Sequence, residues 1–284
     1  MTAHPLLTHF ALAFHPFRPG VPIEALWPPP SVDTFVRRVS LTIADGGFVM
    51  VTGEPGSGKS VALRILAERL GAMRDVQVGS IDHPQSHCSD FYRELGDLFG
   101  VPLARHNRWG GFKALRQRWS DHIGSTLCRP VLIIDEAQEM LTTVFNELRI
   151  LSSRAFDSEQ LLCVIFAGDA RLPDRFRHPD LLPLGSRIRR RLHLDYAERD
   201  ALSACLDHLL DAAGNSALMT TELKSTLAEH SAGNFRVMMN LCDELLTIGF
   251  EREVPQLDEG LYFDVFHPQP VAPPKPPKKR RQRT

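Results

Sequence analysis

The stretch Phe48–Ser60, FVMVTGEPGSGKS, determines the fold of this chain. Its residues Val49 to Thr52 are apolar or β-branched and indicate a buried strand. The residues that follow have the form G-x-x-x-x-G-K-[ST], and a helix-forming run from Val61 to Leu70 comes next. Strand, glycine-rich loop and helix in this order predict a phosphate-binding loop.

The residue types of this loop suit a nucleotide with Mg²⁺. Its glycines permit positive φ angles and let backbone N–H groups approach a polyphosphate closely. Lys59 supplies a positive charge for the β- and γ-phosphates, and the Ser60 hydroxyl is a suitable Mg²⁺ ligand. The nucleotide-binding residues expected in this segment are Gly53, Glu54, Pro55, Gly56, Ser57, Gly58, Lys59, Ser60 and Val61.

A second buried strand ends in two acidic residues. Val131–Ile134 is apolar at every position, which is typical of a parallel strand covered on both faces. Ligands gather at the carboxyl ends of the strands in such sheets. We therefore expect Asp135 to hold the metal together with Ser60, and Glu136 to polarise the attacking water.

Composition indicates a globular protein with reduced thiols. The chain has 284 residues, 43% of them hydrophobic, which is enough for one large domain or two of ordinary size. Its five cysteines are widely spaced without a C-x-x-C pair, so we expect a cytoplasmic location. No apolar run approaches the length of a membrane span, and no membrane partner is expected.

The periodicity of the remaining sequence predicts further strands at 76–81, 161–167 and 188–194. It predicts helices at 31–39, 89–99, 137–156 and 171–177, and a wholly helical region from 197 to 250. The expected division is a lead-in segment at 1–30, a nucleotide-binding α/β domain at 31–195, a helical lid at 196–255 and a Pro-rich basic disordered tail at 256–284. Within the last part, the apolar piece Leu261–Phe266 is expected to dock on the lid or on a neighbour.

Two segments have the composition of nucleic-acid contacts. The segment RHNRWGGFKALRQR interleaves Arg105, Arg108, Lys113 and Arg116 with aromatic residues, which suits a phosphate backbone or, alternatively, a solvated helix face. The net charge of −1 hides a basic end, because the segment 268–284 carries six basic residues and no acid. That tail either grips nucleic acid or an acidic partner, or only solubilises the chain.

In their order along the chain, these motifs resemble those of AAA+ ATPases. The order is the phosphate loop, D-E-A-Q at 135–138, the arginines of S-R-I-R-R-R at 186–191 and A-G-N-F-R at 232–236. The span from about residue 10 to 250 resembles the ExeA-like and TniB/MuB-like branch. This resemblance implies an αβα sandwich with a parallel five-stranded sheet of strand order 5-1-4-3-2 and a small helical lid.

The resemblance also implies a function. Relatives of this branch bind ATP and Mg²⁺, form homo-oligomers as rings or helical filaments on double-stranded DNA, and recruit or activate a transposase in DNA transposition and recombination. ATP hydrolysis would release the oligomer. The alternatives are a secretion-assembly ATPase of the ExeA kind and a slow nucleotide-gated signalling scaffold.

Individual roles follow from the same resemblance. Lys59, Glu136 and Arg187 would be catalytic, with Arg187 reaching the γ-phosphate of the neighbouring subunit. Arg189, Arg190 and Arg191 are close enough to take that role instead, and a basic edge strand is the plainer interpretation. Arg236 matches the lid arginine that contacts the phosphates within one subunit.

Asp169 departs from the family pattern, which usually has a neutral polar residue at this strand end. A carboxylate there would repel phosphate unless an arginine or the metal pairs with it. We therefore expect slow hydrolysis, stimulated by oligomerisation or DNA, with Asp169 among the nucleotide-binding residues.

Overall fold

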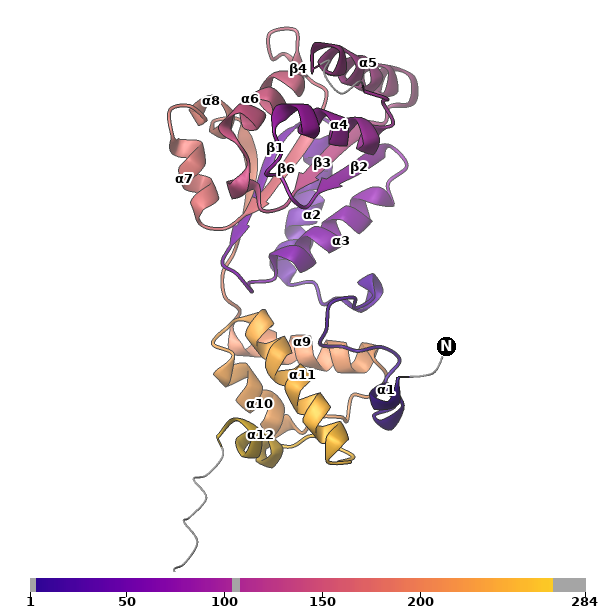
Figure 1. Ribbon diagram of the computed structural model, residues 1–284, viewed down its shortest axis with the longest axis vertical. Coiled ribbons are helices and arrows are strands. Elements are labelled where there is room, and N and C mark those ends of the chain that lie inside the picture. The colour runs from indigo at the N-terminus through magenta and orange to yellow at the C-terminus, as the bar shows by residue number, and fades with distance from the viewer. Residues whose placement is uncertain (1–3, 104–107, 268–284) are drawn as a thin grey trace, which may run out of the picture.

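The computed structural model describes residues 4–103 and 108–267. It consists of an α/β unit and a helical unit, which lie one above the other in Figure 1. Two sequence predictions fall outside the described residues: the nucleic-acid contact at Arg105 and the basic tail from residue 268 onward.

The α/β unit is built on a fully parallel sheet of five strands. Its strands are β1 (Gly47–Gly53), β2 (Val76–Ile81), β3 (Arg129–Ile134), β6 (Cys163–Gly168) and β7 (Ile188–Leu194). They lie side by side in the order β2-β3-β6-β1-β7. The P-loop AAA+ α/β fold expected from the sequence is confirmed.

The strand labels differ in detail from the expected numbering because the sequence did not predict one hairpin. The short strands β4 (Ser153–Arg154) and β5 (Glu159–Gln160) form a separate antiparallel pair before β6. Counted without them in chain order, the strands of the sheet read 5-1-4-3-2 from β7 to β2.

Helices cover both faces of the sheet because its strands are apolar on both sides. Val49 and Val51 of β1 face α2 (Pro30–Ile43) and α3 (Lys59–Gly71). Phe48 and Met50 face the opposite layer, which contains α4 (Cys88–Phe99), α5 (Arg108–Thr126), α6 (Thr142–Leu151), α7 (Arg171–Arg177) and α8 (Leu182–Gly185). Alternate side chains of one strand thus enter two separate cores.

The segment 137–156 is not the single helix that the sequence predicts. Glu136 takes a left-handed φ of 49°, a 3-10 turn η2 (Ala137–Glu139) follows, and α6 begins only at Thr142. α6 ends at Leu151, and the chain then turns at Ala155, Phe156 and Asp157, which all have positive φ. Those three residues form the turn of the hairpin β4–β5.

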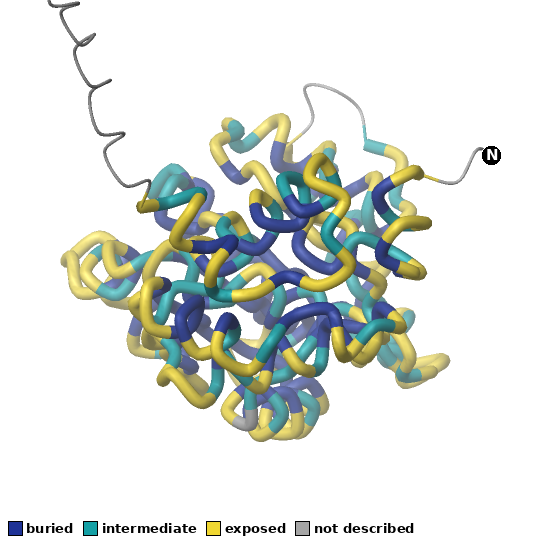
Figure 2. The backbone as a smooth tube through the Cα atoms, turned by 90° about the horizontal axis from the view of Figure 1, so that it is seen from below, coloured by how far each residue is buried: buried dark blue, intermediate teal, exposed yellow. Residues whose placement is uncertain are grey.

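The helical unit contains α9 (Arg199–Ala212), α10 (Thr221–His230), α11 (Phe235–Glu251) and α12 (Glu259–Phe266). The lead-in segment, with α1 (Pro5–His9) and η1 (Ile23–Ala25), packs into the same core through Leu6, Phe10 and Phe17. Seen from below in Figure 2, buried backbone lies mainly inside the molecule and exposed backbone mainly on its outer turns.

The C-terminal boundary differs from the one expected at residue 256. α12 is an ordered helix whose Leu261 and Tyr262 are buried against the helical unit. Its N-cap Asp258 accepts a hydrogen bond from the backbone N–H of Leu261 at 2.8 Å. The apolar piece 261–266 therefore docks on the lid, one of the two positions considered for it.

A substitution in the lead-in segment tests its place in the core of the helical unit. Phe10 is 2% exposed, so Phe10→Ala should lower the free energy of unfolding by about 3–5 kcal/mol in a urea titration. Phe263→Ala is the control, because Phe263 is 44% exposed and should change stability much less. Equal effects of the two substitutions would contradict this packing.

Candidate nucleotide-binding site

The loop after β1 has the backbone geometry that a phosphate-binding loop needs. Gly56 and Gly58 have φ angles of 87° and 96°, and Gly58 is the N-cap of α3. Gly53 was expected to share this conformation but does not have a positive φ. It is needed for space, because a Cβ there would lie 2.5 Å from both the Leu194 carbonyl oxygen and Ser57 Oγ.

The polar atoms of this loop fit a polyphosphate. Ser57 Oγ is buried and has no hydrogen-bond partner among the described residues. Lys59 Nζ donates to the carbonyl oxygens of Gly53 at 2.6 Å and Glu54 at 3.0 Å, so its ammonium lies over the loop. An anion seated on the N-terminus of α3 would meet this ammonium and the backbone N–H groups together.

The two acids after β3 lie at the same edge of the sheet. β6 separates β3 from β1, so the ends of these two strands stand roughly 10 Å apart, enough for phosphate and metal between them. Asp135 is half-buried, and burial raises its pKa while the Glu136 N–H, 2.9 Å from its Oδ1, partly offsets that effect. A metal ion shared by Asp135 and Ser60 would stabilise the charged carboxylate.

Gln138 belongs to the site but was missing from the sequence prediction. Its Nε2 donates to Glu136 Oε2, and its Oε1 accepts a hydrogen bond from the Asp169 N–H at 3.2 Å. The only signal for it was its position in the D-E-A-Q motif. Sequence spacing does not reveal that its amide joins the ends of two different strands.

Asp169 at the end of β6 is paired with an arginine of its own chain. Its carboxylate accepts hydrogen bonds from the Arg171 backbone N–H at 2.9 Å and from Arg171 Nε at 2.8 Å. Burial alone would raise the pKa of Asp169, but the hydrogen bonds from Arg171 outweigh burial and hold it below its usual value. Asp169 therefore has the arginine partner that a carboxylate near a phosphate needs in order to offset their repulsion.

The helical unit contacts the phosphate loop directly. The Phe235 N–H donates to the Gly56 carbonyl oxygen at 3.0 Å, and Asn234 Nδ2 donates to the Pro55 carbonyl oxygen at 3.0 Å. Asn234 Oδ1 also caps α11 by accepting from the N–H groups of Arg236 and Val237. The Arg236 side chain is exposed at this helix start, and its contact with phosphate remains a prediction.

Arg187 does not lie at the nucleotide-binding edge of its own chain. It precedes β7, whose first residue pairs with Phe48 at the start of β1, so it lies at the opposite edge of the sheet from the phosphate loop. Its Nη2 is 2.6 Å from Asp157 Oδ2 in the hairpin turn. Any action of Arg187 on a phosphate must therefore occur in a neighbouring copy.

The basic and aromatic side chains of α5 divide into two groups. Arg108 pairs with the buried carboxylate of Glu147, which also accepts a hydrogen bond from the Tyr92 hydroxyl at 2.8 Å. Burial raises the pKa of Tyr92 to about 12, so the phenol stays a donor. The Arg108 guanidinium thus neutralises a buried charge, and its contact with nucleic acid stays a prediction.

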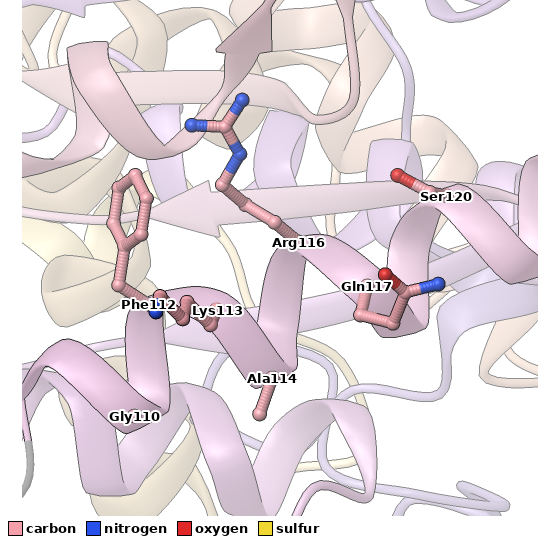
Figure 3. Close-up of a pocket in the computed structure, with 7 residues that line it drawn as sticks. All are labelled: Gly110, Phe112, Lys113, Ala114, Arg116, Gln117 and Ser120. Atoms are coloured by element: carbon pink, nitrogen blue, oxygen red, sulfur yellow. The ribbon is translucent and has the colours of Figure 1, made fainter.

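The second group on α5 remains on the surface. The rings of Trp109 and Phe112 stack at 5.3 Å, with Lys113 Nζ 5.6 Å from the Trp109 ring and the Arg116 guanidinium 5.0 Å from the Phe112 ring. Phe112 and Arg116 project from the same side of the helix, next to an open pocket whose lining includes Gln117 and Ser120 (Figure 3). We call Trp109, Phe112, Lys113 and Arg116 the α5 surface.

Part of the chain is similar to a known protein family. Residues 43–176 match the family model described as an AAA domain. The match covers a little under half of the chain. It contains the phosphate loop, the Asp135-Glu136 pair and Asp169, and the helical unit lies outside the match.

One curated protein and several solved structures are similar to a larger part of the chain. General secretion pathway protein A of Aeromonas hydrophila is 31% identical over 219 residues, which are 76% of this chain and 39% of that protein. The chain thus spans about two fifths of the length of this relative.

The fold of Cdc6p from Pyrobaculum aerophilum has a TM-score of 0.68 at 13% identity, covering 85% of this chain and 67% of that one. The structure of Drosophila ORC bound to DNA has a TM-score of 0.69 at 16% identity, covering 92% and 65%. At these identities the two structures support only the fold of the α/β unit and the helical unit.

Two features are absent from the described residues. No group of three or more His, Cys, Asp or Glu side chains in the described ranges is placed to hold a metal ion. A Mg²⁺ ion at Ser60 and Asp135 would take its other ligands from phosphate and water. Within residues 4–103 and 108–267, no helix is long and apolar enough to cross a membrane.

Asn234 tests the contact between the helical unit and the phosphate loop. Asn234→Ala removes a helix cap and the bond to Pro55, so it should cost about 1 kcal/mol of stability and also weaken nucleotide binding. Thr220→Ala is the matched control, because Thr220 caps α10 through the Leu223 N–H and no described bond links its side chain to the loop. If both variants bind nucleotide equally in a titration, the loop contact has no role in binding.

Proposed function

We propose that this protein is an ATP-hydrolysing AAA+ switch that binds double-stranded DNA and regulates transposition. The observation that carries the ATPase assignment is the gathering of four groups at one edge of the sheet. These are the Lys59 ammonium over the phosphate loop, the Asp135 carboxylate, Glu136 held by Gln138, and the Arg171-paired Asp169. In-line attack of water on a γ-phosphate needs groups that bind the phosphates, a ligand for the metal ion and a general base for the water.

In this proposal, backbone N–H groups of the loop and Lys59 bind the phosphates, and Ser60 and Asp135 hold Mg²⁺. The Mg²⁺ ion would neutralise charge on the β- and γ-phosphates. Glu136 accepts the proton of the attacking water. Arg187 acts in the neighbouring subunit of a homo-oligomer, ring or filament, after leaving its pairing with Asp157.

The DNA assignment rests on the α5 surface. Stacked aromatic rings with two cations against their faces suit a nucleic acid, because phosphates meet the cations and bases or sugars meet the rings. A structure of similar fold, Drosophila ORC, is described as bound to DNA, which supports the same partner here. A transposase is the proposed protein partner, and the cytoplasm is the proposed location.

A second candidate function has its own support. The 31% identity to General secretion pathway protein A favours an ATPase that serves assembly of a secretion apparatus. In that case the α5 surface would contact protein rather than DNA. The two candidates share the nucleotide chemistry and differ only in the partner.

The catalytic role of Glu136 has a direct test. Glu136→Gln should keep ATP affinity and lower kcat by about 10²-fold or more, because the amide cannot accept the proton. Phosphate release measures turnover, and sedimentation with ATP should show oligomers that persist longer than those of the unaltered chain. Turnover equal to that of the unaltered chain, or lost ATP binding, would contradict the assignment.

The DNA role is tested by a matched pair on α5. Arg116→Ala should weaken ATP-dependent binding of duplex DNA and lower the slope of log affinity against log salt by roughly 0.9, one phosphate contact. Arg118→Ala removes the same charge from an exposed position two residues further along the helix and should change binding much less. If the unaltered chain hydrolyses ATP but shows no DNA binding at low salt, the secretion-type function replaces this one.

A further inference from the structure

Both ends of the Gln138 side-chain amide are engaged, and the partners belong to different strand ends. Nε2 donates to the Glu136 carboxylate after β3, and Oε1 accepts from the Asp169 N–H after β6. Gln138 is only 6% exposed, so water does not easily substitute for either partner. Because an amide donates at one end and accepts at the other, only one orientation satisfies both groups.

The end of β6 leaves room for this amide. A Cβ at position 168 would lie 2.3 Å from Gln138 Oε1, so glycine is needed for the amide to reach the backbone there. The contact therefore depends on a close approach of side chain to main chain.

α7 holds the same segment from its other side. Arg175 Nη1 donates to the carbonyl oxygens of Gln138 and, at 2.6 Å, of Met140. Arg171 joins Asp169 to Glu139 with Nη2 distances of 2.7 Å to each carboxylate. A shift of η2 would have to break bonds to two arginines, so the segment that carries Gln138 is fixed on both sides.

We propose that Gln138 is a positioning residue for ATP hydrolysis, which fixes the carboxylate of Glu136 relative to the end of β6. This inference rests on the proposed ATPase function. Glu136 is exposed and has a left-handed backbone, so its side chain has little other restraint than this amide. Without the amide, the Glu136 carboxylate would be oriented toward the attacking water for a smaller fraction of the time. This loss of orientation should lower kcat and leave nucleotide affinity unchanged.

The kinetic test is Gln138→Ala in the full chain. We expect kcat to fall about tenfold or more while KM and nucleotide affinity stay unchanged, because the residue touches the base and not the phosphates. Gln256→Ala is the control and should leave kcat unchanged, because Gln256 is exposed on the helical unit and its amide donates only to the Ala217 carbonyl oxygen among the described residues. A raised KM with kcat unchanged, or no change at all, would overturn the proposal.

A second measurement does not depend on turnover. Hydrogen exchange of the Asp169 amide should speed up in Gln138→Ala, since that N–H loses its acceptor. Gly168→Ala should produce the same two effects by displacing the amide from the other side. If Gln138→Ala does not fold, Gln138→Asn takes its place, and unchanged Asp169 exchange in the folded variant would refute the link.

A double substitution isolates the action through Glu136. In the Glu136→Gln background, Gln138→Ala should cause no further loss of kcat, because the base it positions is already gone. Losses that multiply would show independent roles and overturn the proposal. If the unaltered chain does not hydrolyse ATP, both the proposed function and this inference are refuted. If the unaltered chain is active and Gln138→Ala has the same kcat, this inference alone is refuted.

Discussion

Hydrogen bonds join the helical unit to the phosphate loop. Asn234 and Phe235 hold the carbonyl oxygens of Pro55 and Gly56, so the start of α11 fixes the loop that must receive the nucleotide. Gly56 lacks a Cβ at this point, and a Cβ would lie 2.0 Å from Asn234 Oδ1. The loop is thus held from two sides, by the sheet and by the lid.

The lid in turn depends on the first residues of the chain. Arg18 pairs with Asp243 of α11 at 2.9 Å, and the Val21 carbonyl oxygen accepts from Arg64 Nη2 of α3 at 2.7 Å. The lead-in segment therefore touches both units. A movement of the phosphate loop would displace α11 and the lead-in segment together, because Asn234 bonds α11 to the loop and Arg18 bonds the segment to α11.

Local pattern was sufficient to predict the five strands, the parallel sheet and the phosphate loop. These depend on apolar runs and on a motif whose residues are adjacent in sequence, so periodicity and spacing contain the information. The long helix predicted over 137–156 was wrong, because the extended residues Met140 and Leu141 delay its start to Thr142 and the hairpin turn at 155–157 follows its end at Leu151. Such turns without glycine leave no clear signal in the residue types.

The pairing of charges was harder to predict than the site itself. Arg108 and Arg187 were read as ligands for nucleic acid and for a neighbour's phosphate, yet each contacts a carboxylate of the same chain, Glu147 or Asp157. Both partners are at least 30 residues away in sequence. Gln138 was overlooked for the same reason, since its role follows from the adjacency of β3 and β6 in space.

The strand β7 has one further consequence for any assembly of this chain. Within the described residues it pairs only with β1, and its Arg189, Arg190 and Arg191 are exposed. Mutual repulsion of these guanidinium groups discourages two sheets from merging edge to edge. Subunits brought close together would then stay separable, and their association would stay reversible rather than proceeding to fibrous aggregates.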